Sequence, residues 1–342
     1  MMRKSFALNR RALAMRLAVT LTMAGTMAGG LALTSIVPAE AADYTLNVNT
    51  ALTTDDPLYK GLESFQANVA ERSKGALEVK LFPSSQLGKD EDVLEQARAG
   101  APVAVVVDGG RLAVFVEEFG ALGAPFLASG YGGIRKVVTS DLFEDWVGKL
   151  HDQAGLQVLS FNWWQGERHL LTNKPVTVPA DLDGVRMRTP GAPVWMETIR
   201  AMGATPTPMG WTEVYSALQQ QVIDGAEAQH PATNGSKLYE VISHITKTGH
   251  INLITGVVTS GAWFDSLPGE LQTILREEAL KAGDVASYGT EAALTDIEKE
   301  MQAKGVTITE IDVTPFREAT APVYDKLGYG ELRDKLRSIA AQ

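Results

Sequence analysis

The sequence predicts an α/β fold with mostly parallel sheets, because short apolar segments alternate along the chain with amphipathic helical segments. About 300 of the 342 residues follow an N-terminal segment of different composition, and that length predicts two lobes rather than one core. With 45% apolar and 21% charged residues, the composition is globular and excludes a disordered or fibrous chain.

Strands are indicated by alternating or continuous apolar residues, and helices by apolar residues three and four positions apart. The nearly continuous apolar run 102–107 is typical of a strand buried on both faces of a parallel sheet. Asp56 and Pro57 have the residue types of a helix N-cap and first turn. We expect strands at 44–49, 77–81, 102–107, 156–161 and 184–188, and helices from Pro57 and over 90–99, 134–153, 192–202 and 212–221.

The longest helical segment runs from 269 to 304 and carries apolar residues near helical spacing. Gly283 and Gly289 interrupt it, and glycine lowers helix stability. Two shorter helices are one interpretation of this segment. A single helix of roughly 50 Å that braces both lobes is the other, and it is the one we favour.

The N-terminal segment has the three parts of a secretory signal peptide. Residues 1–16 carry five basic side chains and no acid, residues 17–37 are uncharged, and Ala39-Glu40-Ala41 is a small-residue cleavage motif. We therefore expect a cleaved signal peptide over 1–41 and a protein that acts outside the cytoplasm, in the periplasm. An uncleaved membrane anchor is the competing interpretation, and the Arg10-Arg11 pair leaves twin-arginine export open beside the general secretory route.

Charge and composition exclude several classes of function. The net charge of −10 becomes −14 without residues 1–41, which argues against a nucleic-acid partner. The absence of cysteine excludes disulfides, thiolate metal sites and cysteine nucleophiles. The five histidines have no metal-ligand spacing, and the chain has no nucleophile elbow, P-loop or zinc-protease motif. We therefore predict no catalytic residues, no metal and no cofactor.

Arginine at the end of a predicted strand is the strongest candidate for a binding residue. If Val185 and Met187 face the core, Arg186 and Arg188 share the other face of the strand, and Arg188 lies at its carboxyl end before Pro190. Ligands of open α/β sheets bind beyond the carboxyl ends of strands. A guanidinium there matches the geometry of a carboxylate, although a surface position or a structural ion pair is the commoner role of an arginine.

Several motifs recur in an order and spacing that identify a family. They are FPSSQLG at 82–88, a segment ending in APF at 119–126, LDGVRMRTP at 182–190, MGATPTPM at 202–209, EVYSALQ at 213–219 and VIDGAE at 222–227. Together they resemble the solute-binding proteins of tripartite ATP-independent periplasmic (TRAP) transporters, the DctP-like family. The resemblance covers nearly the whole chain after residue 41.

The resemblance implies a periplasmic binding protein fold of two lobes, each with a mixed, mostly parallel sheet flanked by helices, and a long helix that spans both lobes. We expect lobe I to comprise 42–165 and 254–288, and lobe II 166–253 and 289–342. The implied function is capture of an organic acid anion, a carboxylate or a sulfonate. TRAP membrane permease subunits, driven by an ion gradient, would then accept the captured acid.

The resemblance also implies which residues bind the acid. Arg188 matches the main carboxylate clamp of the family, and Arg168 matches a second arginine that assists it. Trp211 falls where the family places an aromatic wall, usually Phe. Asp108 falls where a polar residue reaches ligand hydroxyls, and Trp164 lies in an aromatic stretch that borders the pocket.

One motif departs from the family pattern. Many relatives carry Asn directly after the acidic turn that ends here at Glu227, whereas this chain has Ala228 followed by Gln229. Glu227 and Gln229 are therefore candidate ligand contacts, and sialic-acid-type or simple C4-dicarboxylate specificity is in doubt. Sugar acids, keto acids, hydroxy acids, aromatic acids and sulfonates all stay open.

Two other functions compete with transport by a TRAP system. A binding protein for an ABC importer or a sensor kinase would have a similar composition and export signal. A secreted hydrolase would use Asp108 with Glu227 or His169 as acid and base, but these residues form no recognised nucleophile–base pattern.

Overall fold

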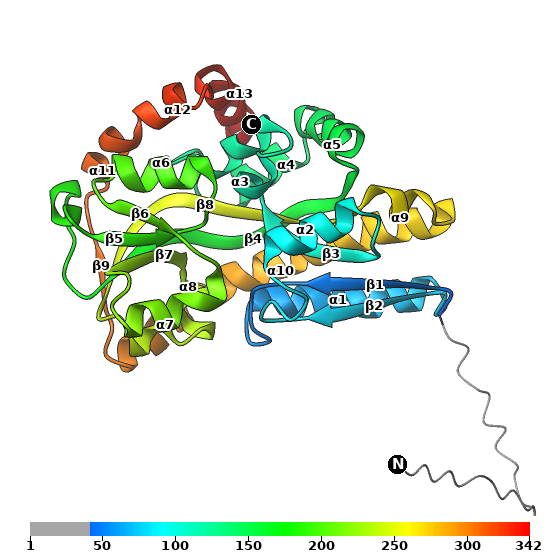
Figure 1. Ribbon diagram of the computed structural model, residues 1–342, viewed down its shortest axis with the longest axis horizontal. Coiled ribbons are helices and arrows are strands. Elements are labelled where there is room, and N and C mark those ends of the chain that lie inside the picture. The colour runs from blue at the N-terminus through cyan, green and yellow to red at the C-terminus, as the bar shows by residue number, and fades with distance from the viewer. Residues whose placement is uncertain (1–41) are drawn as a thin grey trace, which may run out of the picture. The chain divides into compact units, whose positions relative to one another are not determined.

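One mixed sheet of nine strands organises residues 42–342, the part of the chain that this computed structural model describes (Figure 1). The expected signal peptide at 1–41 lies outside the described residues. The strand order is β2-β1-β3-β8-β4-β7-β5-β6, and β9 pairs with β8. The strands are β1 (Tyr44–Asn49), β2 (Leu77–Phe82), β3 (Val103–Asp108), β4 (Leu156–Thr172), β5 (Arg186–Thr189), β6 (Thr205–Pro208), β7 (Gly225–Gln229), β8 (His244–Ser260) and β9 (Thr307–Glu310).

The sheet has two parallel parts, which we call the N-terminal lobe (β1–β3) and the C-terminal lobe (β5–β7). Strands pair in parallel within each lobe. The antiparallel strands β4 and β8, each 17 residues long, run through both lobes (Figure 1). This arrangement confirms the predicted α/β fold with two lobes.

Thirteen α-helices in the described chain surround the sheet (Figure 1). They are α1 (Pro57–Arg72), α2 (Asp90–Arg98), α3 (Gly109–Leu112), α4 (Gly130–Val138), α5 (Asp141–Ala154), α6 (Pro193–Ala201), α7 (Val214–Gln219), α8 (His230–Gly235), α9 (Gly261–Asp265), α10 (Gly269–Ala303), α11 (Thr314–Thr320), α12 (Pro322–Lys326) and α13 (Gly330–Ala341). Short 3₁₀ helices are η1 (Glu117–Gly123), η2 (Pro179–Leu182), η3 (Trp211–Glu213) and η4 (Leu238–Glu240).

Two expectations about helices were wrong. The segment 134–153 forms two helices, α4 and α5, because the Ser140 hydroxyl accepts the backbone N–H of Phe143 and caps a new helix there. The segment 212–221 begins as the 3₁₀ helix η3 and ends earlier than expected. The helix from Pro57 forms as predicted, with the Asp56 carboxylate accepting the Leu58 N–H at 2.9 Å.

The long helix α10 is a single helix of 35 residues, as favoured above. It packs against α1 in the N-terminal lobe, crosses β4, and reaches α8 and β9 at the other end of the sheet. Gly283 does not break it. Instead, the missing side chain lets α10 approach Asn162 of β4, whose amide donates to Leu280 O and Asp284 Oδ1 at 2.8 Å.

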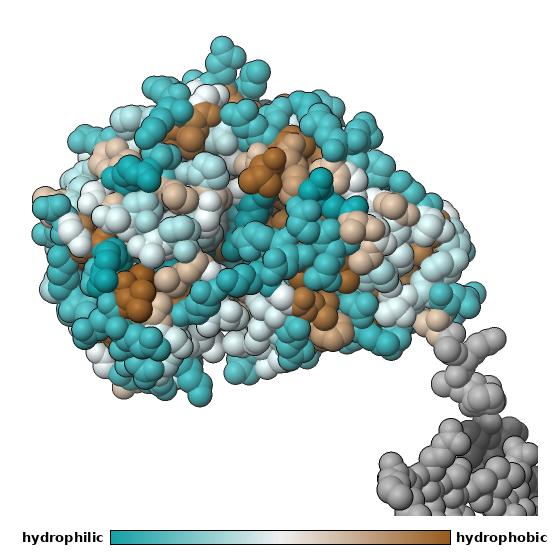
Figure 2. All heavy atoms as spheres, viewed as in Figure 1, coloured by the Kyte–Doolittle hydropathy of each residue, from teal (hydrophilic) through white to brown (hydrophobic). Residues whose placement is uncertain are grey.

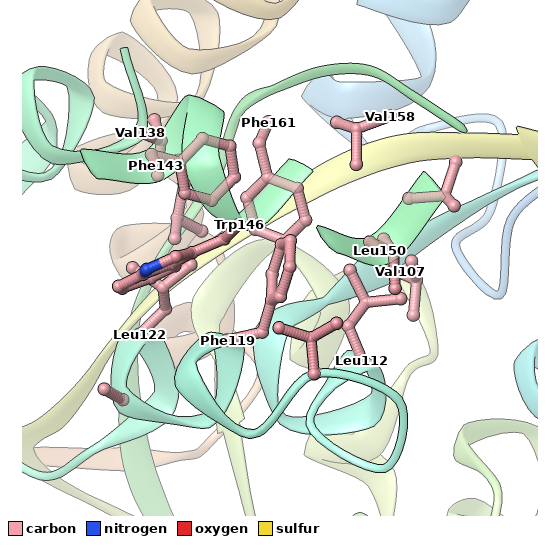
Figure 3. Packing of buried hydrophobic residues seen from close by; sticks show 14 of the residues in the cluster. Val107, Leu112, Phe119, Leu122, Val138, Phe143, Trp146, Leu150, Val158 and Phe161 are labelled. Atoms are coloured by element: carbon pink, nitrogen blue, oxygen red, sulfur yellow. The ribbon is translucent and has the colours of Figure 1, made fainter. Parts of the chain in front are cut away.

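The largest hydrophobic cluster lies under α4 and α5 in the N-terminal lobe. Four aromatic side chains interlock at its centre with ring centroids 5.3–5.9 Å apart, and Figure 3 shows them converging from η1, α5 and β4. They are Phe119, Phe143, Trp146 and Phe161.

The surface carries few large apolar side chains. Figure 2 shows that hydrophobic residues on one face form small, separate groups among hydrophilic ones. Three of the six exposed large hydrophobic residues in the described chain, Leu280, Val285 and Tyr288, lie on α10. Over residues 42–342 we find no helix with the combined length and apolarity that crossing a membrane requires.

Two glycines of α10 test this packing. We expect Gly283→Ala to lower the free energy of unfolding by about 1–3 kcal/mol, because the new methyl group would overlap the bonded Asn162 side chain. Gly289→Ala is the matched control, since nothing lies within 4 Å of its Cβ position and alanine favours a helix by up to about 1 kcal/mol. Urea unfolding measures both, and equal effects of the two variants would contradict the packing.

Candidate ligand-binding site

A cavity of about 60 Å³ lies where strand ends of the two lobes meet. Thr50 follows β1, Asp108 ends β3, Pro190 follows β5 and Gln229 ends β7, so the carboxyl ends of parallel strands converge on it from both lobes. This is where open α/β sheets bind ligands. The two long strands complete the wall with Gln165 and Arg168 from β4 and Leu253 and Thr255 from β8.

Five of the seven predicted binding residues line this cavity: Arg188, Arg168, Trp211, Asp108 and Gln229. The sixth, Glu227, is fully buried directly behind Arg168. The cavity also contains residues that the sequence analysis missed, namely Thr50, Asp90, Arg111, Gln165, Trp195 and Thr255. Of these, only Arg111 could have been predicted from the sequence, because it follows the predicted site residue Asp108 by three positions. In a helix that spacing places both side chains on one turn.

The structure corrects the prediction for Trp164, which does not line the cavity. Its side chain packs against Tyr131 in the N-terminal core, with ring centroids 6.3 Å apart, and its indole N–H donates to Asn252 Oδ1. Register shifts between β4 and β8 on both sides of this residue change which side chains face the cavity. His169 likewise faces a separate cavity of about 630 Å³.

Arg188 is a buried cation without an acidic partner. Its side chain is 1% exposed, and in the described chain no carboxylate lies within 4 Å of its guanidinium. Nε and Nη2 donate to Met209 O at 3.1 and 2.8 Å, and the guanidinium lies 5.3 Å from the Trp211 ring centroid. Burial, reinforced by the charge of Arg168, lowers the pKa of Arg188 to about 9. Arg188 is therefore the one of the three cavity arginines that forms no ion pair within the described chain.

Arg168, in contrast, is already neutralised. Its Nε and Nη2 donate to the Glu227 carboxylate, and Nη1 donates to Gln229 Oε1 at 3.1 Å. The Thr189 hydroxyl also donates to Glu227 Oε1 at 2.9 Å. The guanidinium stacks on Trp195, 4.7 Å from the ring centroid. Its charge is paired and four of its five N–H groups donate to Glu227 and Gln229, so Arg168 is held in place by this chain's own groups.

Arg111 is the third arginine of the cavity and has acidic neighbours. Its Nη1 pairs with Asp108 Oδ2, its Nε donates to Glu91 Oε1 at 2.7 Å, and its Nη2 lies 3.6 Å from Asp90 Oδ2. Asp108 Oδ1 accepts the backbone N–H of Arg111 at 3.0 Å. Burial raises the pKa of Asp90 to about 6, and the charge of Arg111 partly offsets this effect.

Amide side chains connect the two lobes along the cavity wall. Gln229 Nε2 donates to Gln165 Oε1 at 2.6 Å, and Gln165 Nε2 donates to Thr255 Oγ1 at 3.3 Å. Next to the lining residues Asp90 and Trp211, Lys89 before α2 pairs with Glu213 of η3 at 2.5 Å. Among residues 42–342, no group of three or more histidine or carboxylate side chains is arranged to hold a metal ion.

Comparison with known proteins identifies the family of this chain. The model of the DctP family, bacterial extracellular solute-binding protein family 7, matches residues 48–330. The chain belongs to this family. The ectoine/5-hydroxyectoine-binding periplasmic protein UehA of Ruegeria pomeroyi is 31% identical over 90% of this chain and 91% of its own. DctP-family relatives are TRAP periplasmic solute-binding proteins, as the sequence motifs indicated.

Two solved structures of DctP-family relatives differ in their likeness to this chain. The Escherichia fergusonii TRAP solute-binding protein, in an apo open structure, is 50% identical over 86% of this chain and 99% of its own, with a TM-score of 0.76. The Ochrobacterium anthropi protein with bound L-fuconate is 30% identical over 87% of this chain and all of its own, with a TM-score of 0.85. By TM-score, the backbone of the described chain is thus more similar to the ligand-bound relative, although the sequence identity is lower.

A buried histidine beside the site makes stability depend on pH. His250 is fully buried, its Nδ1 lies 2.7 Å from Thr248 Oγ1, and its Nε2 lies 3.8 Å from Glu227 Oε2. Burial, reinforced by the charge of Arg168, lowers the pKa of His250 to about 3. Since an unfolded histidine takes up a proton near pH 6.5, the free energy of unfolding falls as the pH drops from about 6.5 towards 3.

We expect His250→Asn to remove this part of the pH dependence. Between pH 7.5 and pH 5, the wild type would lose about 2 kcal/mol more of its unfolding free energy than the variant loses. Urea unfolding at the two pH values measures the difference. Identical losses in both proteins would show that His250 is protonated in the folded state.

Proposed function

We propose that this protein captures an organic acid anion between its lobes and delivers it to a TRAP-type membrane permease. The observation that carries the proposal is the buried guanidinium of Arg188, which forms no ion pair with a carboxylate of the described chain. A buried charge without a counter-charge is unfavourable, so an anion in the cavity would be bound strongly. The L-fuconate in the O. anthropi relative is a sugar carboxylate and supports the same ligand class.

The remaining donors of Arg188 define how the acid would bind. Nε and one N–H of Nη2 are used by Met209 O, which leaves the edge formed by Nη1 and Nη2. Two parallel hydrogen bonds from this edge match the two oxygens of a carboxylate. In this proposal Trp211 fixes the plane of the guanidinium, and Arg168 positions Gln229 rather than gripping the acid itself.

Closure of the lobes would exclude water from this ion pair and strengthen it. The proposed lobes are 42–165 with 254–288 and 166–253 with 289–342. We place the hinge where the chain passes from one lobe to the other, within β4, β8 and α10. A register shift between Trp164 and Gly166, opposite Leu253, coincides with the crossing in β4 and β8 and supports this placement. The Lys89–Glu213 pair, which joins α2 to η3, would form only in the closed state.

The proposal includes cleavage of the signal peptide after residue 41 and function in the periplasm. DctP-family relatives are periplasmic solute-binding proteins, and no catalytic reaction is part of the proposed role. The carboxylates offered as acid–base candidates are engaged, because Asp108 pairs with Arg111 and Glu227 with Arg168.

Substitution of the two buried arginines tests the clamp. We expect Arg188→Met to weaken acid binding by about 30-fold to several thousand-fold, which corresponds to a loss of about 2–5 kcal/mol. The same variant would leave the ligand-free protein as stable as the wild type or more stable, because a buried charge without a partner is removed. Thermal shifts with a panel of organic acids, followed by calorimetric titration of the best ligand, measure binding.

Arg168→Met is the matched control and should behave in the opposite way. It leaves Glu227 buried without its partner, so we expect the free energy of unfolding to fall by about 3–5 kcal/mol. If no acid in the panel raises the melting temperature, or if Arg188→Met binds acid as the wild type does, the proposed function is wrong.

A further inference from the structure

A second cavity, of about 630 Å³, lies on the other side of β4 from the ligand-binding cavity. Arg168 lines the ligand-binding cavity, whereas its neighbours Glu167 and His169 line the second one. Successive side chains of a strand point to opposite faces, so β4 separates the two cavities. They share no lining residue, and the proposed function uses none of the side chains around the second cavity.

Three arginines from the C-terminal helices converge on this second cavity. Arg317 of α11 and both Arg333 and Arg337 of α13 line it. The guanidinium groups of Arg333 and Arg337 lie 5.4 and 5.6 Å from the ring centroid of Tyr324. The guanidinium of Arg317 lies 5.0 Å from the ring centroid of Phe126, whose O accepts Arg337 Nη2 at 3.1 Å. Two residues thus hold all three cationic groups close together.

Two of the three arginines have no acidic partner. Arg333 pairs with Asp334 at 2.8 Å, but in the described chain neither Arg317 nor Arg337 has a carboxylate within 4 Å. Both are exposed, so solvent stabilises their charges in the absence of a ligand. Their donors therefore stay available to an anion that enters the cavity.

Two carboxylates also line the second cavity, and neither pairs with the arginines. Glu310 pairs with Lys247, the fourth cation of the lining, at 3.1 Å. Glu167 Oε1 accepts the backbone N–H of Gly130 at 3.3 Å. Four cations and two carboxylates leave an excess of two positive charges around the cavity, although the chain without residues 1–41 has a net charge of −14. An anion would therefore be attracted by this local group and not by the overall field.

Phe126 has a strained backbone conformation beside the arginines. Its φ of +53° lies in the left-handed region, which residues other than glycine rarely adopt. Its N–H donates to His250 O at 2.9 Å, while its O accepts Arg337 and its ring contacts Arg317. Such strain persists only where the surroundings fix it, and it is concentrated at functional sites.

His169 adds a neutral donor to the lining. It is 5% exposed, and its Nδ1 accepts the backbone N–H of Gly249 at 3.1 Å, so the neutral ring carries its proton on Nε2. Burial, reinforced by the charge of His230, lowers the pKa of His169 well below its usual value and keeps the ring neutral. Among residues 42–342 this Nε2–H has no acceptor, and an oxygen atom of a ligand in the cavity would provide one.

We propose that the second cavity binds a phosphate group, carried by a small organic ester or present as free phosphate. A phosphate group has about 1.5 to 2 negative charges near pH 7 and three strong acceptor oxygens, which suit several converging guanidinium groups. Leu127, Ile311 and Val313 line the same cavity and would contact the organic part of an ester. The site does not depend on the clamp at Arg188.

Binding is best measured in a chain without the acid clamp. The mature protein with Arg188→Met would be titrated calorimetrically with phenyl phosphate, inorganic phosphate and benzoate, in a buffer free of phosphate. We expect both phosphates to bind, and to bind less tightly as the salt concentration rises. Benzoate, with one negative charge, should bind more weakly than either.

Substitution of the unpaired arginines tests the contacts. Arg317→Gln and Arg337→Gln should each weaken phosphate binding by about 5- to 10-fold, as expected for the loss of one exposed charge-assisted contact. Lys335→Gln is the matched control, because it removes one positive charge from an exposed position of α13 that does not line the cavity. It should bind phosphate as the parent does. With Arg188 intact, none of the three substitutions should change the binding of organic acids.

The outcomes separate this site from the proposed function. Tighter binding of phenyl phosphate than of inorganic phosphate would support an ester as the ligand, and equal binding would support free phosphate. The inference is overturned if the Arg188→Met protein binds neither phosphate, or if Lys335→Gln weakens binding as much as the arginine substitutions do. If phosphate binds through Arg317 and Arg337 but no organic acid binds the wild type, the second site stands and the proposed function is overturned.

Discussion

The site depends on how three guanidinium groups can be buried around one small cavity. Each would repel the others and lose its hydration, so each needs compensation from nearby groups. Glu227 compensates Arg168, and Asp108 with Glu91 compensates Arg111, but Arg188 has only a backbone carbonyl and the face of Trp211. Among the described residues, Arg188 is thus the one guanidinium of the cavity that has no carboxylate within ion-pair distance.

The strands that form the cavity wall also connect the lobes. Gln165 and Arg168 flank Gly166, whose backbone has a φ of +103° that glycine adopts readily, at the register shift of β4. A rotation of the lobes about this point would move the flanking side chains relative to strand ends of both lobes. A ligand can favour closure only if it binds the closed state more tightly, and contacts to both sides of the proposed hinge would meet that condition.

Part of this arrangement is predictable from the sequence, because it depends on local patterns. Arg188 follows from strand alternation and Pro190, and α10 follows from its spacing of apolar residues. The partners of the arginines do not follow, since Glu227 reaches Arg168 only through pairing of β4 with β7, and Asp90 reaches Arg111 only across two helices. Most of β4 and all of β8 escaped prediction because they carry many polar residues, which are nevertheless buried in the sheet.

An aromatic ring and a backbone carbonyl fix the guanidinium of Arg188 in the orientation that the proposed function requires. Trp211 covers the guanidinium of Arg188, and Trp211 is itself fixed because its indole N–H donates to Ser236 Oγ at 3.0 Å. Met209 O accepts hydrogen bonds from the Nε–Nη2 edge of the same guanidinium. The side-chain entropy of a long arginine is therefore lost on folding and not again on binding, so more of the ion-pair energy is available for affinity. If Arg188 binds the acid as proposed, discrimination among acids would depend on the other polar groups that line the cavity, which include the carboxylates Asp90 and Asp108 and the amides Gln165 and Gln229.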